Sequence, residues 1–435
     1  MEKFGKRFCV SARKSKDDIN RHYPLHLTES TFSRRDFLAR AVITAGAGLL
    51  GCSDSVDPLP DPDPDPSKSG LDHIIVVTME NRSFDHLLGW VPGADGKQSG
   101  LTYLDESGAP HVTHHLTDSQ ECAGADPNHS FEGGRTEYNN GACDGWLTTE
   151  GNDLYAIGYY EAADEAFLGR AALEWTVLDK YFAPILGPTF PNRLISQSGQ
   201  TDRLSNTETA STLPTIWDRL IIANLRGRNY GNTLTTAGLW GARYASLIRP
   251  MSEFFRDAIN GDLPEVAFID PDFAIGAPNN SYHPPSDIRD AEAFLANIYS
   301  AITRSPNWKS TLLVITFDEW GGFFDHVRPP VAPIPDIERA AGNTDGLRGF
   351  RVPTLLISPF APRGAVSSAL YDHASILRTI EWRWSLAPLS VRDAQANSLA
   401  DELNFGSPQL TAPVIEVTGG PFGRECPPAA FRESR

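Results

Sequence analysis

The stretch IIVVTMENRSFDHLLG, residues 74–89, joins a run of β-branched residues directly to a charged and amide-bearing cluster. Ile74 to Val77 form a pattern typical of a strand buried on both faces. Thr78 and Met79 come next, and the polar residues Glu80 and Asn81 follow them directly. Because sites in open α/β sheets form at the carboxyl ends of strands, the stretch predicts a central strand that carries a functional site at its end.

Other apolar runs along the chain predict the rest of a sheet. We expect buried strands at 73–78, 264–269, 311–317 and 352–358. Apolar residues at helical spacing predict helices at 162–178, 286–303 and 372–384. Strands that alternate with helices favour an α/β fold, with a mostly parallel central sheet and helices on both faces. Residues 90–151 lack such periodicity and predict long active-site loops.

The composition limits the function classes. With 435 residues and 40% hydrophobic composition, the chain can bury a sizeable core. Its formal net charge is -17, and the first 51 residues are basic, so the remainder is more acidic still. A nucleic-acid-binding protein is expected to be basic, so we expect no nucleic-acid partner.

The N-terminal segment predicts export. SRRDFL, residues 33–38, precedes an apolar run at 39–50 that is shorter than the roughly 20 residues needed to span a bilayer. This arrangement resembles a twin-arginine signal peptide, and the following LLGC resembles a lipobox with Cys52 as the lipidated residue. The alternative is a plain cleaved signal. The protein is then periplasmic, anchored to a membrane through Cys52, or secreted.

An alternating Asp/Pro segment, residues 57–66, predicts an extended spacer because it cannot form a helix or a ladder. We therefore expect a signal peptide at 1–51, a linker at 52–70 and a single catalytic domain at 71–435. Cys122 and Cys143 bracket part of the loop region, and export makes a disulfide between them a reasonable expectation. Cys426 would then be unpaired.

Carboxylates recur at the ends of the predicted strands. Asp318 and Glu319 directly follow one apolar run, and Asp270 directly follows another. Gathered beside Glu80 and Asn81, these groups would repel one another without a cation, and oxygen-rich clusters of this kind bind a divalent metal ion. For a lone Asp–Glu pair, a helix cap or a surface salt bridge is the simpler explanation.

The segment GPTFPNRLISQSG, residues 187–199, predicts the start of a helix, with Thr189 at the N-cap. A hydroxyl at this position faces free N–H groups and the positive end of the helix dipole, which favours phosphate binding. Contact with a metal ion would make the Thr189 oxygen a nucleophile. The alternative is that Thr189 only caps its helix.

Four histidines lie in polar, turn-forming loops. Imidazoles in such loops can donate to a phosphoryl oxygen or protonate a leaving group. The four are His129, His283, His326 and His373. No G-x-S-x-G segment is present, which disfavours a serine hydrolase of that type.

Five segments in order resemble the bacterial phosphoesterase family, which contains phosphatidylcholine-hydrolysing phospholipases C and a group of acid phosphatases. They are HIIVVTMENRSFDHLLG, GPTFPNRL, HPPSD, FDEWGGFFDHVRPP and DHASILRTIEWRW, and they lie between residues 71 and 388. The resemblance implies an alkaline-phosphatase-like α/β fold and one divalent metal ion.

The resemblance also implies roles for individual residues. The metal and phosphate ligands would be Glu80, Asn81, Thr189, Asp318 and Glu319. Thr189 would be the nucleophile, as in the phospholipase branch, and His129 and His283 would contact phosphate. His326 is a further candidate for the same group, and His373 matches a motif without an assigned role.

We therefore expect a metal-dependent, phospholipase C-like phosphoester hydrolase that acts through a phospho-threonine intermediate. The alternatives are an acid phosphatase of broad specificity and an inactive, surface-tethered binding lipoprotein. Residues 204–264 are short for the family's substrate-specificity region, and the chain ends soon after the last motif. The head group, and the preference for a phosphodiester or a phosphomonoester, therefore remain open.

Overall fold

An eight-stranded sheet forms the centre of the computed structural model, which describes residues 64–119, 124–273, 279–420 and 422. Four neighbouring strands at its middle run parallel: β11 (Thr311–Phe317), β1 (His73–Met79), β10 (Val266–Ile269) and β8 (Gly227–Tyr230). β9 (Ile248–Arg249) continues this parallel set beyond β8. On the other side lie β12 (Leu355–Ile357), antiparallel to β11 and β6 (Thr176–Leu178), and then β13 (Val366–Ser367).

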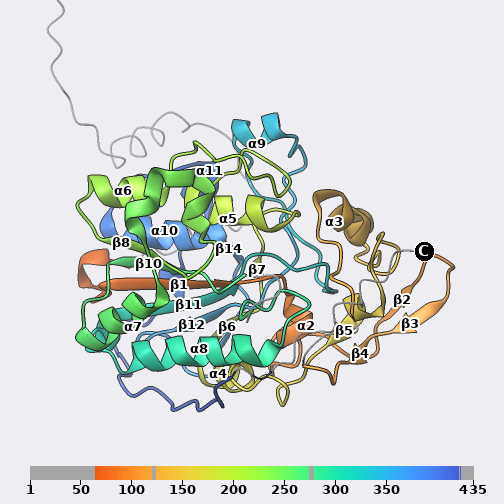
Figure 1. Cartoon of the computed structure of the whole chain (residues 1–435), viewed down its shortest axis with the longest axis horizontal. Helices are drawn as coiled ribbons and strands as arrows, with labels where there is room; N and C mark the ends of the chain where they lie inside the picture. The colour runs from red at the N-terminus through yellow and green to blue at the C-terminus, as the bar shows by residue number, and fades with distance from the viewer. Residues whose placement is uncertain (1–63, 120–123, 274–278, 421, 423–435) are drawn as a thin grey trace, which may run out of the picture. The chain divides into compact units, whose positions relative to one another are not determined.

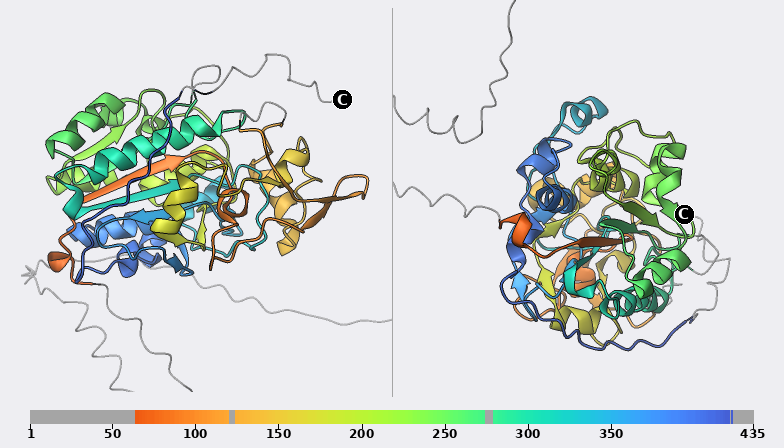
Figure 2. Two further views of the ribbon diagram at one scale, coloured as in Figure 1. Left: turned by 90° about the horizontal axis from the view of Figure 1, so that it is seen from below. Right: turned by 90° about the vertical axis from the view of Figure 1, so that its left-hand side faces the viewer.

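Helices cover both faces of this sheet (Figures 1 and 2). One layer contains α5 (Thr189–Ser198), α6 (Ile216–Ile222), α10 (His373–Trp384) and α11 (Val391–Gln395). The other contains α4 (Leu168–Glu174), α7 (Met251–Asn260) and α8 (Ile288–Thr303). The expected α/β class, with a mostly parallel sheet between two helical layers, is confirmed.

The remaining elements are short. The further helices are α2 (Phe84–Leu88), α3 (Phe131–Tyr138) and α9 (Asp336–Ala341). The further strands are β2 (Thr102–Leu104), β3 (Pro110–Val112), β4 (His114–His115), β5 (Gly158–Tyr159), β7 (Tyr181–Phe182) and β14 (Tyr371–Asp372). Short 3-10 helices lie at Pro66–Lys68, Asn139–Gly141, Leu154–Ile157, Thr236–Leu247, Trp308–Ser310 and Leu399–Glu402.

The predicted strands and the helices at 286–303 and 372–384 are confirmed, but two expectations are wrong. The helix expected over 162–178 is confined to α4, and its last residues form strand β6, where Val177 is fully buried against the sheet. Residues 90–151 also contain more than loops, because Ser130 caps α3 by accepting a hydrogen bond from the Gly133 N–H at 3.0 Å. Short polar helices of this kind lack the apolar spacing on which the prediction depended.

The export signal, Cys52 and most of the Asp/Pro linker lie outside the described residues. Cys122 and Cys426 do so too, so the expected disulfide stays a prediction, while its other half, Cys143, is buried. Within the described residues, no helix has both the length and the apolar character needed to cross a bilayer.

The contribution of the central sheet to stability can be tested by truncating one buried side chain. Leu313 on β11 is fully buried and lies in register with Ile75 on one side and Ile357 on the other. We expect Leu313→Ala to lower the free energy of unfolding by about 2–5 kcal/mol, measured by urea denaturation. Ile222→Ala is the control, because Ile222 is 79% exposed and its truncation should change stability by less than about 0.5 kcal/mol. Equal effects of the two variants would contradict this assignment of the core.

Candidate active site

The end of β1 brings Glu80 and Asn81 to the carboxyl edge of the sheet. Both are buried, and Glu80 is fixed by its backbone N–H, which donates to the Ser281 carbonyl at 2.9 Å. Asn81 adopts a left-handed conformation with φ 57°, which Asn tolerates better than most residues. This turn ends the strand and places two buried polar side chains directly after it.

Asp318 and Glu319 follow β11, the neighbour of β1, and are fully buried. The Oδ1 atom of Asp318 accepts hydrogen bonds from the backbone N–H groups of Asn81 at 3.1 Å and Glu319 at 2.8 Å. One carboxylate therefore joins the two strand ends. Gly321 then donates its N–H to Oε2 of Glu319 at 2.6 Å.

Thr189 is the first residue of α5, and its hydroxyl donates to Oε2 of Glu80 at 3.5 Å. The N-cap is Pro188, one residue before the predicted position, and Thr189 makes no capping bond to its own helix. The backbone N–H of Phe190, in the first turn of the helix, donates to Oδ1 of Asn206 at 2.8 Å. The Thr189 hydroxyl thus faces the carboxylate cluster rather than its own helix.

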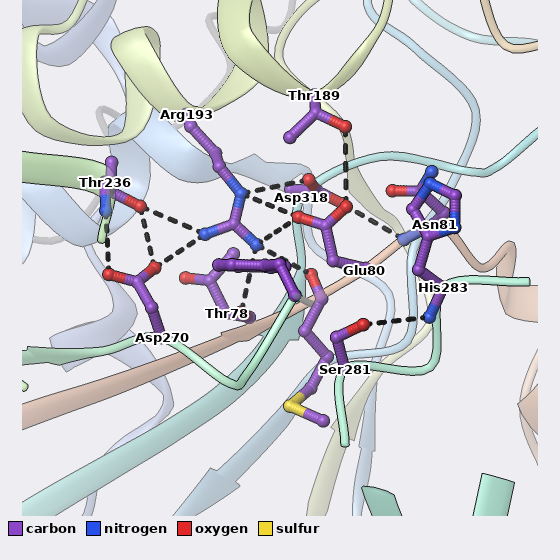
Figure 3. A network of polar contacts seen from close by, with 12 residues as sticks. Thr78, Glu80, Asn81, Thr189, Arg193, Thr236, Asp270, Ser281, His283 and Asp318 are labelled. Atoms are coloured by element: carbon purple, nitrogen blue, oxygen red, sulfur yellow. Dashed lines mark hydrogen bonds and ion pairs between the residues drawn. The ribbon is translucent and has the colours of Figure 1, made fainter. Parts of the chain in front are cut away.

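Arg193, one turn further along α5, lies in the middle of the cluster (Figure 3). Its guanidinium donates to Oε1 of Glu80 at 2.6 and 3.0 Å and to Oδ2 of Asp318 at 3.1 Å. Sequence reasoning missed this residue, although its four-residue spacing from Thr189 puts both on one face of a helix.

Asp270 joins the cluster through Arg193. Its Oδ1 accepts from Arg193 at 2.6 Å and from the Thr236 hydroxyl at 2.7 Å. Its Oδ2 accepts from the Asn229 amide at 2.7 Å and from the Thr236 N–H at 2.9 Å. Both oxygens are therefore fully engaged, and Asp270 anchors the arginine.

Burial and crowding shift the proton affinities of these groups. Burial, reinforced by the nearby charge of Asp318, raises the pKa of both Glu80 and Glu319 well above the usual range. Burial disfavours the charged form of Arg193, but the carboxylates of Glu80, Asp318 and Asp270 outweigh it and raise its pKa. The cluster thus favours additional positive charge.

Two oxygen atoms in the cluster are buried without any hydrogen-bond partner: Oδ1 of Asn81 and Oε1 of Glu319. Orphaned buried acceptors are costly, so they mark a position where a cation or a donor belongs. Oε2 of Glu80, the Thr189 hydroxyl and Oδ2 of Asp318 are further oxygen atoms of the cluster, and the five together are a candidate donor set. The residues present therefore fit a hard divalent metal ion.

His129 lies beside this donor set. Its Nδ1 is 2.7 Å from the Pro127 carbonyl, which can only accept, so Nδ1 carries a hydrogen. In the neutral ring Nε2 then accepts from the Asn81 amide nitrogen, which is 3.1 Å away. The Asn81 amide therefore faces His129 with its nitrogen, and its Oδ1 atom has no hydrogen-bond partner. Nε2 is also 3.8 Å from Oε1 of Glu319.

His283 packs edge-to-face on His129, with ring centroids 6.1 Å apart. Its Nδ1 is 2.6 Å from the Pro284 carbonyl, while its Nε2 is 3.9 Å from the Asp126 carboxylate. Asp126, His129 and His283 form a group whose potential ligand atoms lie within 4.8 Å of one another. The structure thus brings both predicted histidines together with the strand-end cluster.

His326 lies in a different network. It is bonded to Asp85 at 2.5 Å and to Asp95 at 3.2 Å. Asp85, Asp325 and His326 are close enough to form a second candidate metal group, but Arg351 already pairs with Asp85 and Asp325 at 3.0 Å each. None of these bonds reaches Glu80, Asn81, Thr189, Asp318 or Glu319.

His373, the histidine without an assigned role, contacts the backbone carbonyl of Asp318. Its Nε2 is 2.9 Å from the Asp318 carbonyl, and its Nδ1 is 3.1 Å from the Tyr181 hydroxyl. Burial lowers the pKa of His373 to about 4, against the opposing effect of the Asp318 carbonyl. A neutral ring is therefore expected to donate to that carbonyl and fix the strand end.

The chain belongs to the phosphoesterase family, whose model matches residues 71–248 and 241–387. Family membership makes it a phosphoric ester hydrolase. It is 32% identical over 389 residues to non-specific phospholipase C6 of Arabidopsis thaliana, covering 80% of this chain and 74% of that protein. It is 28% identical over 462 residues to phospholipase C B of Mycobacterium tuberculosis, covering 86% of each.

Among solved structures, one match is a protein in the alkaline phosphatase superfamily from Vibrio parahaemolyticus. The two share 13% sequence identity, with a TM-score of 0.34, over 54% of this chain and 65% of that one.

The position of Asn81 can be tested through Gly321. A Cβ atom on Gly321 would lie 2.1 Å from the Asn81 carbonyl oxygen, so Gly321→Ala must displace Asn81. We expect phosphoesterase activity to fall by about 100-fold, because small displacements of catalytic groups are costly. Gly108→Ala is the matched control, since Gly108 has a similar positive φ but open space around it. Equal activity of the two variants would contradict a catalytic role for the geometry at Asn81.

Proposed function

We propose that this chain is a metal-dependent, phospholipase C-like phosphoester hydrolase with Thr189 as its nucleophile. The observation that carries the proposal is the Thr189 hydroxyl, which meets Oε2 of Glu80 at the start of α5, beside two orphaned oxygens. This arrangement supplies a nucleophile and a candidate donor set for a cation. The relatives named phospholipase C support the phospholipid-like substrate.

A divalent ion held by Glu80, Asn81, Thr189, Asp318 and Glu319 would supply positive charge opposite the phosphoryl oxygens and lower the pKa of the Thr189 hydroxyl. The other functions belong to the chain itself. Asp318 fixes the strand ends through two backbone N–H groups, and Glu319 is held by Gly321. Preorganised groups of this kind require little rearrangement during the reaction.

In the first step, the Thr189 hydroxyl gives its proton to solvent water, and its Oγ1 atom attacks phosphorus. The P–O bond to the leaving alcohol breaks, and His283 gives that oxygen a proton. His283 suits this role because it is partly exposed and its Nε2 makes no short hydrogen bond. His129 holds the Asn81 amide in place.

In the second step, water attacks the phospho-threonine, with its proton taken by the now neutral His283. The P–O bond to Thr189 breaks, and the threonine oxygen takes up a proton from solvent water. Phosphate or a phosphorylated head group leaves, and each residue regains its starting state. His326 is not assigned a step, because its bonds lie within the Asp85 network.

The proposal includes export by the twin-arginine route, with residues 1–51 as the signal, 52–70 as the linker and Cys52 as the lipid-anchored residue. An enzyme tethered in this way would meet phospholipids at the membrane surface. A broad-specificity acid phosphatase would use the same residues, and it would prefer p-nitrophenyl phosphate to phosphatidylcholine.

Substitution of Thr189 tests the nucleophile. We expect Thr189→Val to lower turnover of phosphatidylcholine and p-nitrophenyl phosphate by at least about 1,000-fold, because the attacking oxygen is lost. Thr189→Ser keeps the oxygen and should keep measurable turnover. Metal content of both variants, measured on purified protein, should remain close to that of the wild type. Substantial turnover by Thr189→Val would contradict the proposed role.

Removal of the metal tests the cofactor. We expect dialysis against a chelator to abolish turnover. When divalent ions are then added one at a time, the native metal ion should restore turnover. In Asp318→Asn, the same additions should fail to restore wild-type turnover, because a charged member of the donor set is lost. Full activity in a preparation shown to be metal-free would contradict the proposal.

A further inference from the structure

Arg193 forms hydrogen bonds with some oxygen atoms of the cluster and makes no contact with others. On Glu80 it occupies only Oε1, so that Oε2 faces the Thr189 hydroxyl. It does not contact the orphaned oxygens of Asn81 and Glu319. Its own side chain is 3% exposed, and the ring of Phe273 lies over the guanidinium at 4.8 Å. A permanently charged guanidinium is therefore buried in the cluster, and the oxygen atoms of Asn81 and Glu319 still have no partner.

A second set of contacts holds the arginine in that position. One end of the guanidinium, Nη1, donates to Asp270 at 2.6 Å and to the Thr236 hydroxyl at 3.0 Å. Nη2 also donates to the Thr78 carbonyl at 3.2 Å. Asp270 is itself held by Thr236 and Asn229, so the anchor is rigid.

The formal charges explain why this matters. Glu80, Asp270, Asp318 and Glu319 carry four negative charges when ionised, and Arg193 supplies one positive charge. The cluster therefore has a net charge of three negative units before a divalent ion binds. A fixed positive charge close to the donor set also repels an incoming cation. Arg193 thus stabilises the metal-free cluster and, at the same time, weakens metal binding.

We propose that Arg193 is a positioning residue that acts as the resident counter-cation of the site, and that Asp270 sets how strongly its charge is felt. The inference depends on the proposed metal-dependent function. By limiting the negative charge, Arg193 keeps the loaded site able to accept an anionic phosphoester. It predicts an unusual combination: loss of Arg193 should tighten metal binding while it slows turnover. A purely structural role would weaken both.

Titration calorimetry on metal-stripped protein tests this, with Mg²⁺, Ca²⁺, Mn²⁺ and Zn²⁺ each added alone. We expect Arg193→Gln to bind the preferred ion at least about tenfold more tightly than the wild type, while kcat/KM of the loaded enzyme falls. Asp270→Asn should bind it more weakly, because one negative charge is lost and Arg193 is released toward Glu80. Arg193→Lys, which keeps the charge, should stay close to the wild-type affinity.

Arg392→Gln is the matched control, because Arg392 is a buried arginine that pairs with Glu338 at 2.7 Å and makes no bond to the site. Both Arg→Gln variants should lower the melting temperature of metal-free protein. Only in Arg193→Gln should added metal raise it by more than in the wild type. If Arg193→Gln does not fold, the Asp270→Asn affinity decides.

The outcomes separate this inference from the function beneath it. Unchanged or weaker metal binding by Arg193→Gln, or tighter binding by Asp270→Asn, would overturn the counter-cation role alone. Failure of the wild type to bind any of the four ions would overturn both the metal requirement and the inference.

Discussion

Four buried carboxylates, three of them bonded to one arginine, are the constraint on which the rest of this site depends. Uncompensated charge in a protein interior is costly, so Glu80, Asp270, Asp318 and Glu319 are tolerable only with cations and donors around them. Arg193 supplies one cation and several donors. The remaining imbalance of charge supports the proposal that the site binds a metal ion.

The topology of the sheet produces this concentration of charge. β1 lies between β11 and β10, all three are parallel, and each ends in at least one carboxylate. Their carboxyl ends therefore bring the acidic groups to one edge, while the strands themselves are mostly apolar and buried. α5 crosses above this edge and places Thr189 and Arg193 one turn apart (Figure 3). Regular secondary structure thus holds both the proposed nucleophile, Thr189, and the positive charge of Arg193.

Sequence patterns were sufficient for the parts of the fold whose causes are local. β-branched runs predicted the central strands, and the abrupt change to polar residues predicted which side chains lie at their ends. Contacts between distant segments were not visible in this way: the bonds of Arg193 to Glu80, Asp318 and Asp270 span 113, 125 and 77 residues. The same holds for His326, whose polar surroundings matched those of His129 but whose partner, Asp85, lies in another network. Strand β6 was missed because its apolar residues continue the spacing of α4.

The central claim is that Thr189 becomes covalently phosphorylated during turnover. The most direct measurement is rapid acid quenching of the metal-loaded enzyme with a phosphomonoester substrate, followed by mass spectrometry of its peptides. A single added phosphoryl group on Thr189, formed and lost at rates compatible with turnover, is the predicted result. Turnover that leaves Thr189 unmodified at every quench time, while another residue carries the phosphoryl group, would contradict the account.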